Sequence, residues 1–236
     1  MLNLVKQYST KAELVYQALV DAIIGNRLTP GTRLIVKEIA EQLSVSDIPV
    51  REALKMLEAT GLIETKPYVG SVVVSPSPEW IEEVFVMRAA LESMAIRTSV
   101  PLLNGEDIKE IIALEDEMKK VASQGNATEY AQLNRQFHNA VIGKSPYPNL
   151  LNMIRDLLVK SQYGRAIFGL KPATIKTSDV EHDQLIEAIQ RRDVTAAEVI
   201  TREHRLRVGN QLAAAIREQK AAKNTGSSDE KLESGN

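Results

Sequence analysis

The sequence predicts a mainly α-helical chain: three helices and a hairpin, followed by a bundle of six helices. Three observations support this fold class. Apolar residues recur at helical spacing along most of the 236 residues, and two short β-type runs flank residue 70. A Ser-Pro-Ser-Pro segment at 75–78 separates a part with both helix and strand patterns from a part with helix patterns alone. With 44% hydrophobic and 25% charged residues, the chain has the composition of an ordinary folded protein.

Residues 1–75 are predicted to form three helices and then two strands. Apolar residues three and four positions apart indicate the helices, and Gly25-Asn26 and Gly61 end the first and the third. The strands are short β-branched runs on either side of a loop that contains proline and glycine. The expected elements are helices at about 14–23, 36–43 and 47–60 and strands at 62–65 and 71–74.

Residues 76–220 are predicted to be helical throughout, because no convincing strand pattern follows the linker. Glycine, proline, asparagine or aspartate stands at each expected break. The polar segment 221–236 contains glycine and serine, and we expect it to be a disordered tail. The expected helices lie at about 78–100, 105–124, 128–143, 149–168, 175–191 and 194–220.

The composition excludes several classes of protein. The chain has no cysteine, which excludes disulfides, thiolate metal sites and cysteine nucleophiles. No apolar run approaches the roughly 20 residues that span a bilayer, and the N-terminus lacks a signal-peptide pattern, so we expect a cytoplasmic protein without a membrane partner. An aromatic content of 4% argues against a stacking platform for single-stranded nucleic acid.

The third helix has the pattern of a helix that enters a DNA major groove. Val50, Leu54 and Leu57 form its inner face, whereas Arg51 and Lys55 share an outward stripe one turn apart. A major groove admits one helix, whose first turns reach the base edges. Three helices followed by a two-stranded wing therefore predict a winged helix-turn-helix.

The start of this helix is also typical of such a role. Ser46 is the expected N-cap, Pro49 is tolerated in the first turn, and free amides at a helix N-terminus can receive a phosphate. Charge argues the other way, because residues 1–75 hold eight basic and eight acidic side chains. A module that binds protein rather than duplex therefore remains an alternative.

Residues 43–54 read LSVSDIPVREAL, and further characteristic positions follow at Leu57, Gly61 and Gly70. With Pro30-Gly31 upstream, this pattern closely resembles the winged helix-turn-helix of the GntR family of bacterial transcription regulators, over about 65 residues. The resemblance implies that a homodimer binds double-stranded DNA at a palindromic operator.

The resemblance also implies roles for single residues. Arg51 corresponds to a base- or phosphate-contacting arginine, Lys37 to a basic DNA contact on the preceding helix, and the tip from Tyr68 to Gly70 approaches the minor groove. Asp47 departs from the family, which usually has arginine there, although an acid near a helix N-terminus gains about 0.3–1 kcal/mol. Arg51 alternatively is a solvated or Glu-paired residue. The expected DNA-binding residues are Lys37, Ser46, Asp47, Pro49, Arg51, Lys55, Tyr68 and Gly70.

The three histidines of the chain, His138, His182 and His204, all lie in the helical part. His182 and His204 each lie eleven residues from Asp193, so an antiparallel hairpin places them at the same height, about 16 Å from its turn. Asn134 precedes His138 by four residues and shares its helix face. Imidazoles, with an amide oxygen as a weaker ligand, suit zinc, nickel and related ions.

Histidines in a helical bundle are more often ordinary hydrogen-bonded residues than ligands. Here residues 134–138 read NRQFH, and with His182 and His204 they resemble the metal motif of the FCD effector domain, which commonly follows a GntR-type winged helix. The resemblance implies a divalent ion, zinc or nickel, held by Asn134, His138, His182 and His204. Six helices resemble the shorter, VanR-like branch of the FadR group.

Asn134 stands where the FCD motif more commonly has aspartate. The missing negative charge predicts weaker metal binding, with a partly occupied site, and a stronger attraction for an anionic effector. Because a carboxylate or water completes the metal's coordination in related domains, the resemblance implies a small organic acid as effector. Arg88 belongs to an Arg-x-x-Leu-Glu pattern and is expected to bind that acid, or alternatively to pair with Glu92 one turn away.

The leading functional prediction is a ligand-controlled transcription regulator, most often a repressor, without catalytic residues. Its main rival is a metal-dependent hydrolase that uses the three histidines and an open coordination position. Against that rival, the chain has no His-Glu-x-x-His motif, and we expect Glu181 and Asp183 to point away from the site of His182.

Overall fold

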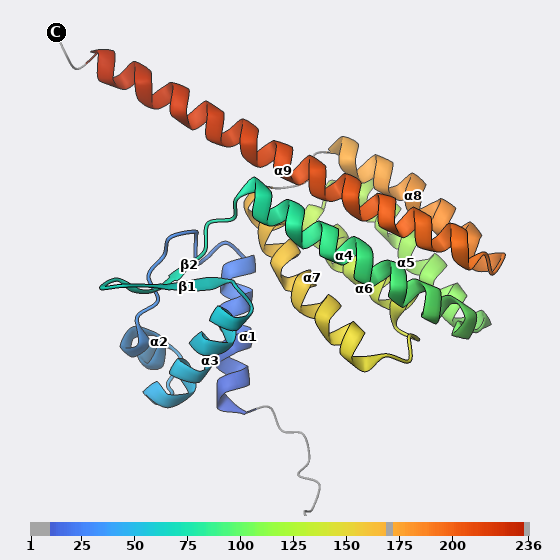
Figure 1. Cartoon of the computed structure of the whole chain (residues 1–236), viewed down its shortest axis with the longest axis horizontal. Coiled ribbons are helices and arrows are strands. Elements are labelled where there is room, and N and C mark those ends of the chain that lie inside the picture. The colour runs from blue at the N-terminus through green and yellow to red at the C-terminus, as the bar shows by residue number, and fades with distance from the viewer. Residues whose placement is uncertain (1–9, 169–171, 234–236) are drawn as a thin grey trace, which may run out of the picture. The chain divides into compact units, whose positions relative to one another are not determined.

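The computed structural model describes residues 10–168 and 172–233, which divide into two compact units (Figure 1). Within the described residues, the first unit contains 10–76 and 162–167, and the second contains the remainder. The division falls next to the predicted Ser-Pro-Ser-Pro linker.

The first unit contains three helices around a small apolar core. Thr10 and Glu13 form a capping box that starts the first helix, and this helix and the second both pack against the third. The side chains of Ile23, Val50 and Leu57 are fully buried where they meet. The helices are α1 (Lys11–Ile24), α2 (Val36–Gln42) and α3 (Asp47–Ala59).

The end of α3 leads directly into the hairpin formed by β1 (Ile63–Lys66) and β2 (Gly70–Val73). The amide of Leu62 donates to the carbonyl of Leu57 and that of Gly61 to Glu58, a Schellman motif that the φ of 71° at Gly61 permits. The strands pair antiparallel, and segment 31–34 adds hydrogen bonds to β2. The predicted winged helix-turn-helix is confirmed.

Among the described residues, the second unit contains five whole α-helices and most of a sixth, α7 (Pro148–Phe168), whose residues 162–167 belong to the first unit; the predicted helical bundle is confirmed. Ser77 caps the first of them, and Asn104 and Asp107 form a capping box at the second. A 3₁₀ turn at Val100–Leu102 follows the first helix. The helices are α4 (Pro78–Ser99), α5 (Gly105–Ser123), α6 (Ala127–Ile142), α7 (Pro148–Phe168), α8 (Pro172–Gln190) and α9 (Val194–Glu233).

The helices of this unit pack side by side in pairs. Helix α4 lies along α9, α9 also packs on α8, and α5 packs on α6 and α8 (Figure 1). Met118, Phe137 and Ile189 are fully buried in the core between them. Gly209 allows the close approach of α9 to α4, because a Cβ there would lie 2.4 Å from the Cβ of Phe85.

The structure differs from the sequence prediction at the C-terminus. Helix α9 continues to Glu233, although we expected a disordered tail at 221–236; residues 234–236 lie outside the described part. The segment contains alanine, lysine and glutamate, which are strong helix formers, and no proline that would stop an existing helix. None of the described helices combines the length and apolarity that crossing a bilayer requires.

Candidate functional site

The outward face of α3 exposes two of the predicted DNA contacts, Arg51 and Lys55. An Nη of Arg51 lies 3.7 Å from the carboxylate of Asp47, with side chains 65% and 46% exposed. A pair this open contributes at most about 1 kcal/mol and can be exchanged for a phosphate or base. Arg51 is therefore paired, as the alternative interpretation had it, but only weakly, and its partner is Asp47 rather than a glutamate.

The first turn of α3 is built differently from the prediction in two respects. Ser46 occupies the N-cap position with an extended backbone, but its side chain makes no capping hydrogen bond. Pro49, expected among the DNA-binding residues, is buried with the inner face of the helix. Ile48, which was not among the predicted site residues, has a side chain that is 69% exposed. Its outward place could have been read from the helical period of the inner residues.

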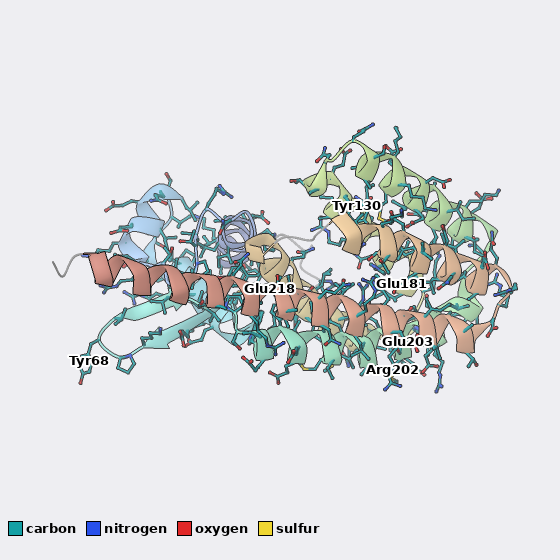
Figure 2. All side chains as sticks on the ribbon, turned by 90° about the horizontal axis from the view of Figure 1, so that it is seen from above. Tyr68, Tyr130, Glu181, Arg202, Glu203 and Glu218 are labelled. Atoms are coloured by element: carbon teal, nitrogen blue, oxygen red, sulfur yellow. The ribbon has the colours of Figure 1, made fainter. Side chains whose placement is uncertain are left out.

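The remaining predicted DNA contacts lie on α2 and on the wing. Lys37 is exposed on α2. Tyr68 projects fully into solvent from the tip of the hairpin (Figure 2) with a φ of 62°, and Gly70 follows with a φ of 93°. Both positive φ values belong to the tight loop between Lys66 and Gly70, which are paired across the hairpin.

The three histidines meet inside the second unit, as the sequence predicted. His138 comes from α6, His182 from α8 and His204 from α9, and all three are buried. Their ring centroids are 5.1–5.4 Å apart, and one ligand nitrogen from each lies within 4.8 Å of the others. Asn134 is buried one turn before His138 on α6.

Two carboxylates fix the orientation of two of these rings. Oε2 of Glu115, on α5, lies 2.9 Å from Nδ1 of His182, and Oε2 of Glu181, on α8, lies 2.6 Å from Nδ1 of His204. When a metal occupies Nε2, a carboxylate in this position accepts a hydrogen bond from Nδ1 and fixes the orientation of the ring. Nε2 of His138 and of His182 are buried without a partner among the described residues.

The expectation that Glu181 points away from the site was wrong. Figure 2 shows it on α8 beside α9, where it contacts His204 and also accepts hydrogen bonds from Arg207. Residue 181 precedes His182, and the turn of α8 therefore aims it at α9 while His182 faces the ring of Phe137 on α6. Asp183 is exposed and pairs with Lys119, as expected for a residue outside the site.

Burial sets the protonation of this cluster. Desolvation, reinforced by the positive charge of Arg205, lowers the pKa of His182 to about 3 and that of His138 well below its usual value. Both rings are therefore neutral near pH 7, the form that binds metals. Burial and the nearby charge of Asp179 raise the pKa of Glu115 to about 8. Three converging buried imidazoles, of which His138 and His182 are neutral near pH 7, fit zinc or nickel.

A buried ion network lies beside the histidines. Nε of Arg88 donates to Glu92 at 2.8 Å and its Nη1 to Ser161 at 2.7 Å, so the predicted alternative of an Arg88–Glu92 pair is present. The second oxygen of Glu92 accepts from Nε of Arg205 at 2.7 Å. The sequence pattern did not indicate Arg205 as a site residue, because the REHRLR run around it has the pattern of a solvated helix face.

Each of the two units corresponds to a known family of protein domains. Residues 11–73 match the family described as bacterial regulatory proteins, gntR family, and residues 83–207 match the FCD domain. The chain is 30% identical over 168 residues to the HTH-type transcriptional regulator McbR of Escherichia coli (strain K12), covering 70% of this chain and 76% of McbR.

A second relative and a solved structure extend the comparison. The probable D-xylose utilization operon transcriptional repressor of Paenarthrobacter nicotinovorans is 29% identical over 192 residues, covering 80% of this chain and 83% of that protein. The solved structure of E. coli McbR/YncC matches with a TM-score of 0.75 and 26% identity, covering 90% of this chain and 100% of that one.

Proposed function

The chain belongs to the GntR family of bacterial regulatory proteins and carries an FCD domain, and we propose that it is a repressor whose hold on a palindromic operator is controlled by a small organic acid. Family membership makes it a DNA-binding transcriptional regulator with an effector domain. It also makes the hydrolase alternative wrong, because regulators of this family are not enzymes.

We propose that two copies of the chain bind one operator in the cytoplasm, each placing α3 in a major groove. Arg51 and Lys55 are exposed on the outward face of α3, where base edges and phosphates are within reach. The DNA backbone is contacted near Ser46, Asp47 and Lys37. The wing from Tyr68 to Gly70 enters the minor groove. Pro49 contributes by shaping the first turn from inside.

We propose that the second unit holds a divalent zinc or nickel ion through His138, His182 and His204, with the amide oxygen of Asn134 as a fourth ligand. The support is chemical: three buried imidazoles converge, burial lowers the pKa of His138 and of His182, and His182 and His204 each have Nδ1 engaged by a carboxyl group. When bound, the ion supplies a positive charge that attracts an anionic effector. Asn134 lowers the negative charge of the ligand set, which favours partial occupancy.

We propose that the effector is a small carboxylate and that Arg88 contributes to its binding through its positive charge. The effector would alter the spacing of the two DNA-binding units, and so their fit to two half-sites. The effector controls DNA binding only to the extent that it binds one spacing of the two DNA-binding units more tightly than the other.

The observation that carries this proposal is that one chain has an exposed recognition helix in one unit and a buried cluster of three histidines in the other. Selection of duplexes from a random pool by the full-length protein should enrich an inverted repeat. Light scattering should give twice the mass of the 26.1 kDa chain. Deleting residues 76–236 should abolish tight binding to the selected duplex, and a tight-binding monomeric fragment would contradict the dimer proposal.

A further inference from the structure

The buried ion network in the second unit carries more positive than negative charge. Arg88, Glu92 and Arg205 are 1%, 1% and 0% exposed, so two guanidinium groups share a single carboxylate. Glu181 does not restore the balance, because it is paired with Arg207. A buried charge without a counter-charge is costly, and proteins rarely keep one unless something pairs with it.

The excess charge is located on one edge of Arg205. Its Nε is held by Glu92, but Nη1 and Nη2 are both buried and have no acceptor among the described residues. Arg88 is different, since Nε, Nη1 and Nη2 all contact Glu92 or Ser161. Two parallel Nη–H donors are the groups that bind both oxygens of a carboxylate.

A further unused polar group lies one turn away on the same face of α9. Thr201 precedes Arg205 by four residues, is 2% exposed, and its Oγ1 has no hydrogen-bond partner in the described part of the chain. His204, which belongs to the histidine cluster, directly precedes Arg205. The charge of Arg205 also acts on the rings of His138 and His182, so the guanidinium group lies near the histidine cluster in the buried interior.

We infer that Arg205, assisted by Thr201, is the subsite that binds the carboxylate group of the effector. The inference rests on the proposed function and deepens it, because it assigns direct recognition to Arg205 and leaves Arg88 to hold Glu92 in place. It also specifies the ligand: a planar anion with two syn oxygens, small enough to be buried beside the histidines.

Charge balance narrows the ligand class further. Without a metal, the network of Arg88, Arg205 and Glu92 has an excess of one positive charge, so a monocarboxylate suffices to neutralise it. A divalent ion on the histidines adds two positive charges and the Glu115 carboxylate beside His182 removes one, so the local excess reaches two positive charges. The metal-loaded protein therefore prefers dicarboxylates to monocarboxylates.

The test measures binding of acetate and succinate, with neutral succinamide as control, to the full-length protein by calorimetry and by melting temperature at constant ionic strength. One sample is stripped with a chelator and one is reloaded with zinc. Succinate should raise the melting temperature and bind the zinc-loaded protein at least about tenfold tighter than acetate, whereas succinamide should bind neither sample.

Three variants assign the effect to the subsite. Arg205→Met should lower the affinity for succinate at least about tenfold, which is the loss expected for a charge-assisted hydrogen bond. The melting temperature of the metal-free variant should be unchanged or higher, because an unpaired charge is removed. Arg205→Lys keeps the charge but not the two parallel donors and should be intermediate. Thr201→Val should lower the affinity for succinate severalfold. Arg202→Met, on the exposed side of α9 (Figure 2), removes the same charge and should bind succinate normally.

Equal succinate affinity in the wild type and in Arg205→Met would overturn the inference. So would a wild type that binds no carboxylate in either sample, together with a lower melting temperature for Arg205→Met, because Arg205 would then be a structural residue. Failure of the operator proposal is distinguishable, since calorimetry detects the carboxylate without DNA. Conversely, an operator response to succinate that survives in Arg205→Met would preserve the regulator and remove only this subsite.

Discussion

Replacing Glu115 by glutamine tests whether the carboxylate beside His182 supports a metal site. The two side chains are each 1% exposed, and the Oε2–Nδ1 separation is 2.9 Å. A carboxylate in this position orients the imidazole and stabilises the charge that the ring acquires on binding a metal. Loss of such a partner typically weakens metal binding by about 10- to 100-fold, or about 1.4–2.7 kcal/mol.

The pH dependence makes this prediction more specific. The pKa of Glu115 is raised to about 8, so the carboxyl group is largely protonated at pH 7 in the metal-free protein and must lose its proton to support the ion. Wild-type affinity should therefore fall about tenfold for each pH unit below 8. His182 and His138 add nothing to this slope, because burial lowers the pKa of His182 to about 3 and that of His138 well below its usual value. The deficit of Glu115→Gln should be full near pH 8.5 and nearly vanish near pH 6.

The assay is a zinc titration of chelator-stripped protein against a competing chelator at these two pH values. Glu117→Gln is the matched control: it makes the same change two residues later on α5, at a side chain that is 45% exposed and pairs with Lys120. It should bind zinc as the wild type does. A Glu115→Gln variant with wild-type affinity near pH 8.5, or with the same deficit at both pH values, would refute the reasoning.

Three further predictions concern DNA binding, packing and acid stability. Arg51→Ala should weaken binding to the selected operator by about 1–3 kcal/mol in a fluorescence titration if Arg51 reads a base, and unchanged binding would exclude that role. Gly209→Ala should lower the free energy of unfolding in urea by about 1–3 kcal/mol, because the new Cβ would lie 2.4 Å from Phe85; a more stable variant would show that α9 yields there. The lowered pKa of His182 means that its contribution to stability is complete above pH 6.5 and is lost as the pH falls toward about 3. Relative to His182→Gln, the metal-free wild type should lose up to about 1.4 kcal/mol per pH unit below 6.5, and parallel stability curves would contradict this.

The helices and the histidine cluster could be predicted because the signals are local and periodic. Capping residues, glycine and proline mark nearly every helix boundary, and a short turn at Asp193 forces the helices carrying His182 and His204 to run antiparallel. Equal spacing from that turn then brings the two rings together, as the 5.1 Å between their centroids shows.

The partners of these histidines could not be predicted, because they depend on contacts between distant segments. Glu115 lies 67 residues before His182 and meets it only through the packing of α5 against α8. Arg205 stands in a charged run that reads as a solvated face, yet the close approach of α9 to α4 buries it completely. The burial of Pro49 also could not be predicted, since the helical period alone did not show that the inner face of α3 extends into its first turn.

The central claim, that a ligand in the helical unit controls operator binding, is tested most directly by the Kd for the selected duplex with and without succinate in the zinc-loaded protein. We predict a sequence-specific Kd that changes at least about fivefold with succinate and not with succinamide. Association that depends only on salt, is equal for every duplex and does not respond to any carboxylate would contradict the claim.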